Sequence, residues 1–332
     1  MPMKSKSVTS LDVARAVGVS RSTVSRAFAQ NTYVKPQVRE EILRVSNKLG
    51  YTPNVFARAL ISQESPIVGI IMHTLSNPFH AELYSTLSRA MQAAGLTPLA
   101  AQLSETGDIK AALRAYRQYQ VKRVVLTSFA ISEGVLEACL NSGLEVVLLN
   151  RTDLKGRTSA ICADLAQGGR LAADHLAARG YARIAILDGL AGSWTGRARS
   201  EGYLQGLATY GLEPVARFEG DYSYEAGLRA AATVQQRVGA IDAVLCANDL
   251  CAFGLMDGLR TAGMSIPGDI AVIGYDDVPM AAWGAYKLTS VRLPVRQMVE
   301  RLIDVLNRSS QAEEPVTEVT FVPCRLVERT SG

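Results

Sequence analysis

Segments that would mark a membrane or secreted protein are absent from this sequence of 332 residues. No apolar run reaches the roughly 18 residues that a membrane-spanning helix needs. The opening residues MPMKSKSVTS lack the apolar core of a secretory signal peptide. No H-E-x-x-H, G-x-S-x-G or phosphate-binding loop pattern occurs either. We therefore expect a cytoplasmic protein that is not an enzyme, has no membrane partner and needs no cofactor.

Cysteine is scarce, and its placement predicts neither disulfides nor a metal site. The five cysteines are odd in number and scattered: Cys139, Cys162, Cys246, Cys251 and Cys324. We expect reduced thiols that pack in the interior of a cytoplasmic protein. A redox pair between Cys246 and Cys251 is disfavoured, because a strand end followed by a helix is expected there.

Positive charge is concentrated near the N-terminus. Residues 1–62 contain ten lysines and arginines but three acidic residues, a net charge of +7. Because the whole chain carries +4, residues 63–332 carry −3. A basic segment on a mildly acidic body is typical of a protein that binds a polyanion. A solvated basic face without a ligand is the alternative.

The stretch VTSLDVARAVGVSRSTVSR predicts two short helices joined by a tight turn. Thr9 is placed to cap the first helix, and Asp12 completes a capping-box pattern. Gly18 ends this helix because the turn needs a residue that can adopt positive φ. Ser20 caps the second helix, which is expected over residues 21–29.

The second helix buries Val24 and Phe28 and turns a row of hydrogen-bond donors outward. This outer face carries Arg21, Ser22, Ser25 and Arg26. Such donors suit base edges and phosphates in a major groove. An ordinary amphipathic helix pair would explain the apolar spacing, but not the glycine turn, the two caps and the donor face together. The sequence therefore predicts a helix-turn-helix that binds double-stranded DNA.

A third helix is expected from Lys35-Pro36 to Gly50. Its apolar positions are Val38, Ile42, Val45 and Leu49. After it, Asn54 could cap one more short helix, which would present Ala57 and Leu60 on the same side.

These motifs resemble the lactose-repressor (LacI/GalR) family of bacterial transcription regulators. The residues that carry the resemblance are Asp12-Val13-Ala14, Gly18-Val19-Ser20, Thr23-Val24-Ser25-Arg26, Gly50-Tyr51, Pro53-Asn54 and Ala57-Arg58-Ala59-Leu60. The resemblance continues to about residue 330. It implies a homodimer on a palindromic operator, with a hinge helix at 54–61 that presses Leu60 into the minor groove. The predicted DNA-contacting residues are Thr9, Ser20, Arg21, Ser22, Thr23, Ser25, Arg26, Tyr33, Asn54, Ala57 and Leu60.

Beyond residue 66, apolar runs of strand length alternate with helical segments, which predicts parallel sheets. The run IVGIIM at Ile67–Met72 is continuous, as expected for a strand covered on both faces. The alternation restarts near residue 166, so two similar α/β halves should face each other across a cleft. In the second half, one helix is expected at 201–210.

We expect an all-α helix-turn-helix headpiece followed by an α/β, periplasmic-binding-protein-like body of two parallel-sheet subdomains. The expected boundaries are 1–50 for the headpiece, 51–65 for the hinge helix and linker, and 66–332 for the effector-binding and dimerisation domain. Within that domain, subdomain 1 takes about 66–161 plus 292–321, and subdomain 2 about 162–291 plus 322–332. The family's tetramerising leucine heptads are absent after residue 324, so a dimer is expected.

The effector-binding candidates are polar residues at the carboxyl ends of the predicted strands, together with Arg199 and Tyr222, which are expected in loops or helix starts on the same side. Carbohydrate recognition needs planar groups that bind paired hydroxyls, together with an aromatic ring face. The candidates are His73, Ser128, Asn150, Arg199, Tyr222, Asn248 and Asp276. The resemblance implies ligand contacts at Arg199, Asn248 and Asp276, and it also supports Tyr222 and Asn150.

For several residues near these candidates, roles other than ligand contact are weighed. Asp249 is expected to cap the next helix, and Asp277 to bind loop backbone. Arg151 could contact ligand or form an ion pair, His175 should be structural, and His80 could face cleft or solvent.

The sequence is thus interpreted as a repressor of carbohydrate catabolism or transport genes, controlled by a sugar-type effector. A non-sugar effector is the alternative, either a sugar acid or a nucleobase. Basic candidates such as Arg199 favour a sugar acid as the ligand, whereas the Asp276 carboxylate would repel a ligand that is anionic throughout. A sugar-transport protein would explain the body but would leave the headpiece without a role.

Overall fold

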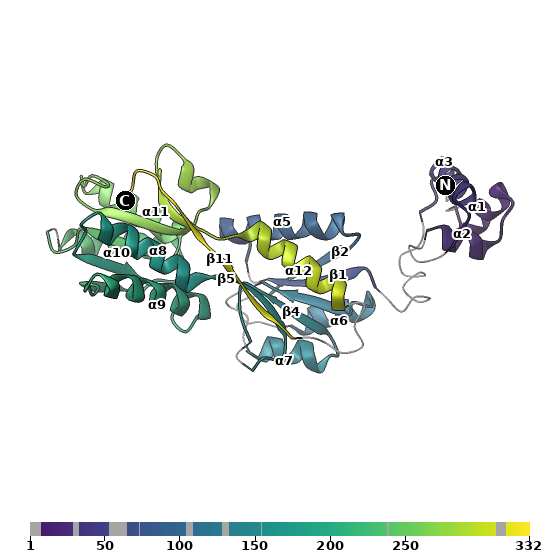
Figure 1. The fold of residues 1–332 in the computed structure, drawn as a ribbon, viewed down its shortest axis with the longest axis horizontal. Coiled ribbons are helices and arrows are strands. Elements are labelled where there is room, and N and C mark those ends of the chain that lie inside the picture. The colour runs from purple at the N-terminus through teal and green to yellow at the C-terminus, as the bar shows by residue number, and fades with distance from the viewer. Residues whose placement is uncertain are drawn as a thin grey trace, which may run out of the picture. The chain divides into compact units, whose positions relative to one another are not determined.

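The computed structural model describes residues 8–28, 33–52, 65–72, 74–103, 109–127, 133–153, 155–237, 239–309 and 317–332. The chain divides into two compact units, Met1–Pro66 and Ile67–Gly332 (Figure 1). Among the described helices, none combines the length and apolar character that crossing a membrane requires. All five cysteines are buried and free, as expected.

Three helices form the headpiece: α1 (Ser10–Val17), α2 (Arg21–Ala27) and α3 (Pro36–Leu49). Their shared core consists of Val13, Ala14, Val24, Ala27, Ile42 and Val45. Gly18 ends α1 with φ at 77°, and Gly50 ends α3 with φ at 69°. Both are left-handed conformations that glycine adopts without the steric cost of a side chain, which confirms the two expected helix ends.

Two expectations about the headpiece need correction. The second helix ends at Ala27 rather than residue 29, and residues 29–32 lie outside the described part of the chain. Leu49 is 38% exposed and does not belong to the core. Tyr51, two residues further on, packs against the core instead, with its ring centroid 6.0 Å from that of Phe28.

The first half of the body, here called the N-lobe, is a six-stranded parallel sheet in the order β11-β5-β4-β3-β1-β2. Its strands are β1 (Ile67–Met72), β2 (Thr97–Gln102), β3 (Arg123–Leu126), β4 (Glu145–Leu149), β5 (Ser159–Asp164) and β11 (Val319–Pro323). Its helices are α5 (Pro78–Ala93), α6 (Lys110–Gln118), α7 (Glu133–Asn141) and α12 (Val295–Ser309). Alternate residues of β1 pack on opposite faces: Ile70 lies in the core with α5 and α12, and Ile71 in the core with α6 and α7 (Figure 1). A strand covered on both faces must be apolar throughout, as this one is.

The second half, the C-lobe, is a mixed sheet in the order β12-β10-β9-β8-β6-β7, in which only β12 is antiparallel to its neighbour. Its strands are β6 (Ile184–Leu187), β7 (Ala216–Phe218), β8 (Ala243–Cys246), β9 (Ala271–Asp276), β10 (Thr289–Arg292) and β12 (Arg325–Val327). Its helices are α8 (Leu165–Ala178), α9 (Trp194–Thr209), α10 (Tyr224–Gln235) and α11 (Asp249–Thr261). Gly274 of β9 faces α11, whereas the next residue, Tyr275, faces α8, so helices cover both faces.

The chain passes between the lobes three times: after Asp164, after Arg292 and between Pro323 and Arg325. The helix expected at 201–210 begins seven residues earlier, at Trp194. It starts there because the Ser193 hydroxyl accepts a hydrogen bond from the Gly196 amide and caps it. This correction matters, because it moves Arg199 from a loop into the interior of α9.

Close contact between α8 and α9 fixes the position of α9 and yields a prediction. A Cβ atom on Gly202 would lie 2.2 Å from the carbonyl oxygen of Ala166, and backbone cannot move aside as a flexible side chain can. Gly202→Ala should therefore lower the free energy of unfolding by about 1–3 kcal/mol, as overpacking does. Chemical denaturation measures this. Gly284→Ala is the control, since nothing lies within 4 Å of its Cβ position; equal effects of the two variants would contradict the packing argument.

Candidate functional site

The outer face of α2 is the candidate DNA-binding surface. Arg21, Ser22, Ser25 and Arg26 are all exposed on it, while Val24 and Ala27 are buried in the headpiece core. Thr23 is half-buried beneath this face. The helix thus presents hydrogen-bonding side chains on its free side, the arrangement needed to enter a major groove.

Two of the expected contact residues are helix caps. The Ser20 hydroxyl accepts a hydrogen bond from the Thr23 amide at 3.1 Å, and the Asp12 carboxylate accepts from both the amide and the hydroxyl of Thr9. Both cap residues remain exposed at the helix starts. Tyr33 is 83% exposed, so its ring is accessible to a partner. Asn54, Ala57 and Leu60 lie outside the described residues.

A second candidate site is a narrow cavity between the two lobes. Its lining residues are Asn77, Phe79, His80, Thr127 and Asn150 from the N-lobe, and Thr195, Arg199, Tyr222, Asn248 and Asp276 from the C-lobe. Five of the seven effector candidates therefore meet in one place. The other two, His73 and Ser128, lie outside the described residues. Asn77, Phe79, Thr127 and Thr195 were not expected, and His80 takes the cleft-facing alternative.

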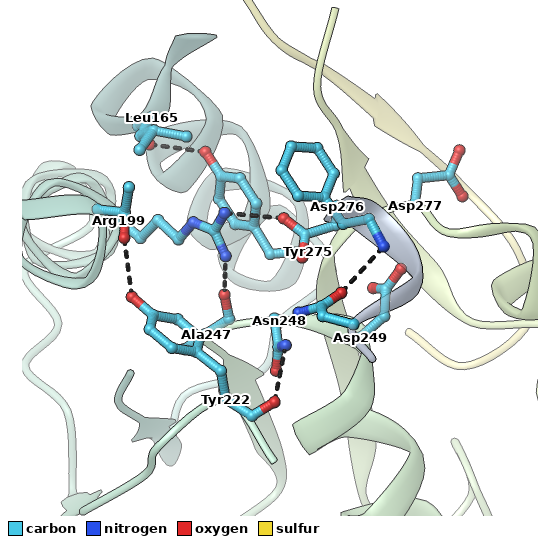
Figure 2. A network of polar contacts seen from close by, with 12 residues as sticks. Leu165, Arg199, Tyr222, Ala247, Asn248, Asp249, Tyr275, Asp276 and Asp277 are labelled. Atoms are coloured by element: carbon cyan, nitrogen blue, oxygen red, sulfur yellow. Dashed lines mark hydrogen bonds and ion pairs between the residues drawn. The ribbon is translucent and has the colours of Figure 1, made fainter. Parts of the chain in front are cut away.

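A buried ion pair occupies the centre of the C-lobe wall (Figure 2). Arg199 donates from Nη2 to Asp276 Oδ1 at 2.8 Å, and from Nη1 to the carbonyl oxygen of Ala247. The guanidinium lies over the Tyr275 ring at 4.2 Å from its centroid, and the Tyr222 ring is 5.8 Å away. Cation–π contact adds to the ion pair where water is excluded. Arg199 is 4% exposed and Asp276 7%.

Burial shifts the acid–base properties of this group. Burial raises the pKa of Asp276 to about 6, with the Arg199 charge and hydrogen bond acting in the opposite direction. For Arg199, burial lowers the pKa, but Asp276 and the nearby tyrosines outweigh it and leave the pKa above its ordinary value. Burial, and then the Asp276 charge, also raise the pKa of Asp249 well above its usual range.

Unusual backbone conformations gather at the cavity. Among the described residues, six other than glycine have positive φ, and three of them line the cavity: Asn150 at 59°, Tyr222 at 67° and Asp276 at 108°. Such conformations cost free energy and persist only where surrounding contacts hold them. The Tyr222 hydroxyl, for example, bonds the hydroxyls of Ser193 and Thr195 at 3.0 and 3.1 Å.

Two polar atoms at the cavity have no partner within the described structure, namely Asn150 Oδ1 and Arg199 Nε. Both atoms are buried. A buried polar atom without a hydrogen bond is costly, and both atoms belong to residues that line the cavity.

Two expectations about neighbouring residues are wrong. Asn248, not Asp249, caps α11: its Oδ1 accepts from the Cys251 amide, and its Nδ2 donates to the Tyr222 carbonyl. Asp249 instead accepts from the Val278 amide and the Ser290 hydroxyl. The Asp277 side chain binds no loop backbone but forms ion pairs with Arg292 and Arg329. In each case the carboxylate's partner lies far along the chain, where sequence spacing gives no signal.

Arg151 and His175 do not contribute to the cavity lining. Burial lowers the pKa of Arg151, whose carbonyl accepts from the Cys162 thiol. His175 is buried in the C-lobe, with Nε2 3.0 Å from the Gly332 oxygen and Nδ1 2.9 Å from Arg179 Nη1. The structural role expected of His175 is confirmed.

Two family models match parts of this chain. Residues 9–54 match the family described as "Bacterial regulatory proteins, lacI family", and residues 173–332 match the "Periplasmic binding protein-like domain". The ribose operon repressor of Escherichia coli K12 is 28% identical, with 98% of this chain and 99% of the relative covered. Catabolite control protein A of Priestia megaterium is 27% identical, with 98% of this chain and 99% of that protein covered. A lac repressor dimer bound to operator and the anti-inducer ONPF has a TM-score of 0.83 at 26% identity, covering 98% and 99%.

The chain belongs to the LacI family of bacterial transcription regulators. Another similar solved structure, the complex of the transcriptional regulator CelR with cellobiose, has a TM-score of 0.73 at 27% identity. The match covers 98% of this chain and all of the CelR chain. These relatives are regulators rather than enzymes. The lacI-family match covers α1, α2 and α3 of the headpiece, and the periplasmic-binding-protein-like match covers most of the C-lobe.

Removing one partner of the buried ion pair should destabilise the LacI-family protein strongly. Asp276→Ala leaves Arg199 buried and uncompensated, which should cost about 3–5 kcal/mol of unfolding free energy. Asp276→Asn keeps an oxygen acceptor for the guanidinium and should cost less. Denaturant unfolding of both variants measures this. Asp188→Ala removes the largely exposed Arg217 pair, also at 2.8 Å, and should cost about 1 kcal/mol or less.

The raised pKa of Asp276 predicts a direction for stability against pH. The folded protein holds this proton more tightly than the unfolded chain, so the stabilisation is complete below the unfolded pKa of about 4 and is lost as pH rises through about 6. Wild type should therefore lose unfolding free energy between pH 5 and 6.5 relative to Asp276→Asn. Parallel denaturation series over this range test it. Curves of the same slope would show that Asp276 does not titrate there.

Proposed function

We propose that this protein is a dimeric transcriptional repressor whose DNA binding is controlled by a small polyhydroxylated ligand in the interlobe cavity. The observation that carries the proposal is the donor face of α2, with Arg21, Ser22, Ser25 and Arg26 exposed on a capped helix-turn-helix. An enzyme or a transport protein has no use for such a surface. The net charge of +7 on residues 1–62 gives this end of the chain its affinity for phosphate backbone.

Two headpieces would read the two halves of a palindromic operator. The lac repressor relative is a dimer in its solved complex with operator, which supports the same assembly here. In a dimer of this kind, each α2 enters one major groove and the half-site spacing mirrors the two-fold axis. The hinge helix with Asn54, Ala57 and Leu60 as a minor-groove wedge remains part of the proposal.

The interlobe cavity would receive the controlling ligand. A molecule bound to Asn150 of the N-lobe and Arg199 of the C-lobe favours one arrangement of the lobes over another. It shifts the regulator only through its different affinity for the two states. The relatives named for the ribose and lactose operons, and the one solved with cellobiose, support a sugar-type ligand and target genes of carbohydrate catabolism or transport. Such a regulator would act in the cytoplasm, where the chromosome is.

The decisive experiment recovers the operator and then the ligand. Selection of bound duplexes from a random-sequence pool with the purified full-length protein should yield one palindromic sequence. A thermal-shift screen of sugars, sugar acids and nucleobases should then identify compounds that raise the midpoint. A compound that stabilises the protein should also change its affinity for that duplex. No enrichment of any duplex would reject the proposal.

Arg21→Ala tests how the headpiece reads sequence. If Arg21 makes a bidentate contact with a base, the variant should lose about 1–3 kcal/mol of operator affinity and little affinity for random DNA. Fluorescence anisotropy with both duplexes at one fixed salt concentration measures the two losses. Arg44→Ala is a suitable control, because Arg44 is exposed on α3 and paired with Glu41. Equal losses on operator and random DNA would assign Arg21 to phosphate alone.

A further inference from the structure

We infer that the interlobe cavity selects an uncharged polyhydroxylated ligand over the corresponding sugar acid, because Asp276 already neutralises the guanidinium of Arg199, the one arginine in the described lining. The inference rests on the proposed function and narrows its ligand class. Two observations carry it. One is the ion pair of Arg199 and Asp276 at 2.8 Å, and the other is the unpartnered Asn150 Oδ1 on the opposite wall.

The charges of the described cavity wall balance. Arg199 and Asp276 form a pair of net charge zero, and Arg151 does not reach the lining. The remaining basic group of the described lining is the His80 imidazole, whose Nδ1 lies 3.1 Å from the Thr74 carbonyl oxygen. Beside the pair, the carboxylate of Glu82 contributes negative potential at Asp276. Within the described lining, a ligand carboxylate would therefore meet an arginine whose charge Asp276 already balances, together with a negative neighbour in Glu82.

The unpartnered atoms favour a hydroxyl for a separate reason. Asn150 Oδ1 is an acceptor, so only a ligand group that carries a proton can satisfy it. Arg199 Nε is a donor and needs an oxygen lone pair. Ligand hydroxyls can serve both atoms, since each is donor and acceptor at once, whereas an ionised carboxylate can serve only Arg199. A polyol that binds both atoms would also connect the N-lobe to the C-lobe.

The same reasoning predicts how the preference can be changed. In Asp276→Asn the guanidinium keeps a hydrogen-bond acceptor but loses its counter-charge, so the cavity gains one positive charge. A sugar acid should then bind better than in wild type, and a neutral sugar no better. The chain offers a matched control in Asp188→Asn. Asp188 pairs with Arg217 at the same distance of 2.8 Å in the same lobe, but this pair borders another pocket.

The experiment is isothermal titration of full-length wild type, Asp276→Asn and Asp188→Asn at pH 8, where Asp276 is ionised. The probes are matched pairs that share a ring and differ in one carboxylate: D-glucose and D-glucuronate, and D-galactose and D-galacturonate. For any pair that binds, wild type should prefer the neutral member by at least about tenfold, the effect of a single pKa unit of charge interaction. Asp276→Asn should shrink or reverse that ratio by a similar factor, and Asp188→Asn should leave it unchanged.

The outcomes separate this inference from the proposed function. Preference of wild type for the acid overturns the inference and leaves a sugar-responsive regulator intact. A ratio that is the same in Asp276→Asn and wild type also overturns it. Binding of none of the probes, combined with a thermal shift from a nucleobase, rejects the sugar-type ligand itself. If Asp276→Asn fails to fold, the preference of wild type between the neutral sugar and the acid of each pair still tests the inference.

Discussion

The burial of one ion pair governs the architecture of the C-lobe. Taking Arg199 and Asp276 out of water costs several kcal/mol for each charge, and their attraction repays this only if the geometry is held. Several features hold it. The glycines of α8 and α9 bring α9 against its neighbour, the Tyr275 ring covers the guanidinium, and the Ala247 carbonyl accepts its second donor. The φ of 108° at Asp276 shows that the backbone accepts strain to bring the carboxylate into place.

Consecutive residues connect this pair to the segments that join the lobes. Asp276 faces the cavity, while Asp277 beside it binds Arg292, the residue at which the chain leaves the C-lobe. The Ser290 hydroxyl, on the same strand, donates to Asp249 and accepts from the Asp277 amide. A ligand that moves Asp276 therefore acts directly on the end of β9 and, one residue later, on a lobe crossing. This short connection makes a small change in the cavity mechanically relevant to the whole body.

Local rules made the headpiece predictable from sequence, and non-local contacts limited the prediction of the cavity. The capping residues Thr9 and Ser20, and the turn at Gly18, act within three or four residues of themselves, so spacing alone identifies them. The sequence predicts Arg199 in the site but not within a helix, because the largely polar first turns of α9, residues 194–201, show no apolar helical periodicity. The sequence predicts local roles for Asp249 and Asp277, yet the partners of their carboxylates lie 15 to 52 residues away. Thr127 and Thr195, which the sequence did not predict in the cavity wall, are brought together by the packing of the two lobes. The spacing of residues along the sequence does not reveal this packing.

The two candidate sites use electrostatics in opposite ways, and this constrains how they communicate. On the headpiece, exposed arginines act through long-range attraction to phosphates, which salt screens. In the cavity, the charges cancel at contact distance, and an uncharged ligand would add none. Binding of such a ligand leaves the net charge of the body unchanged, so it cannot alter DNA affinity by changing the protein's field. The signal must then be carried by geometry, through the strained end of β9 and the crossing at Arg292. Under the proposed function, a neutral effector would therefore act on DNA binding through relative movement of the lobes.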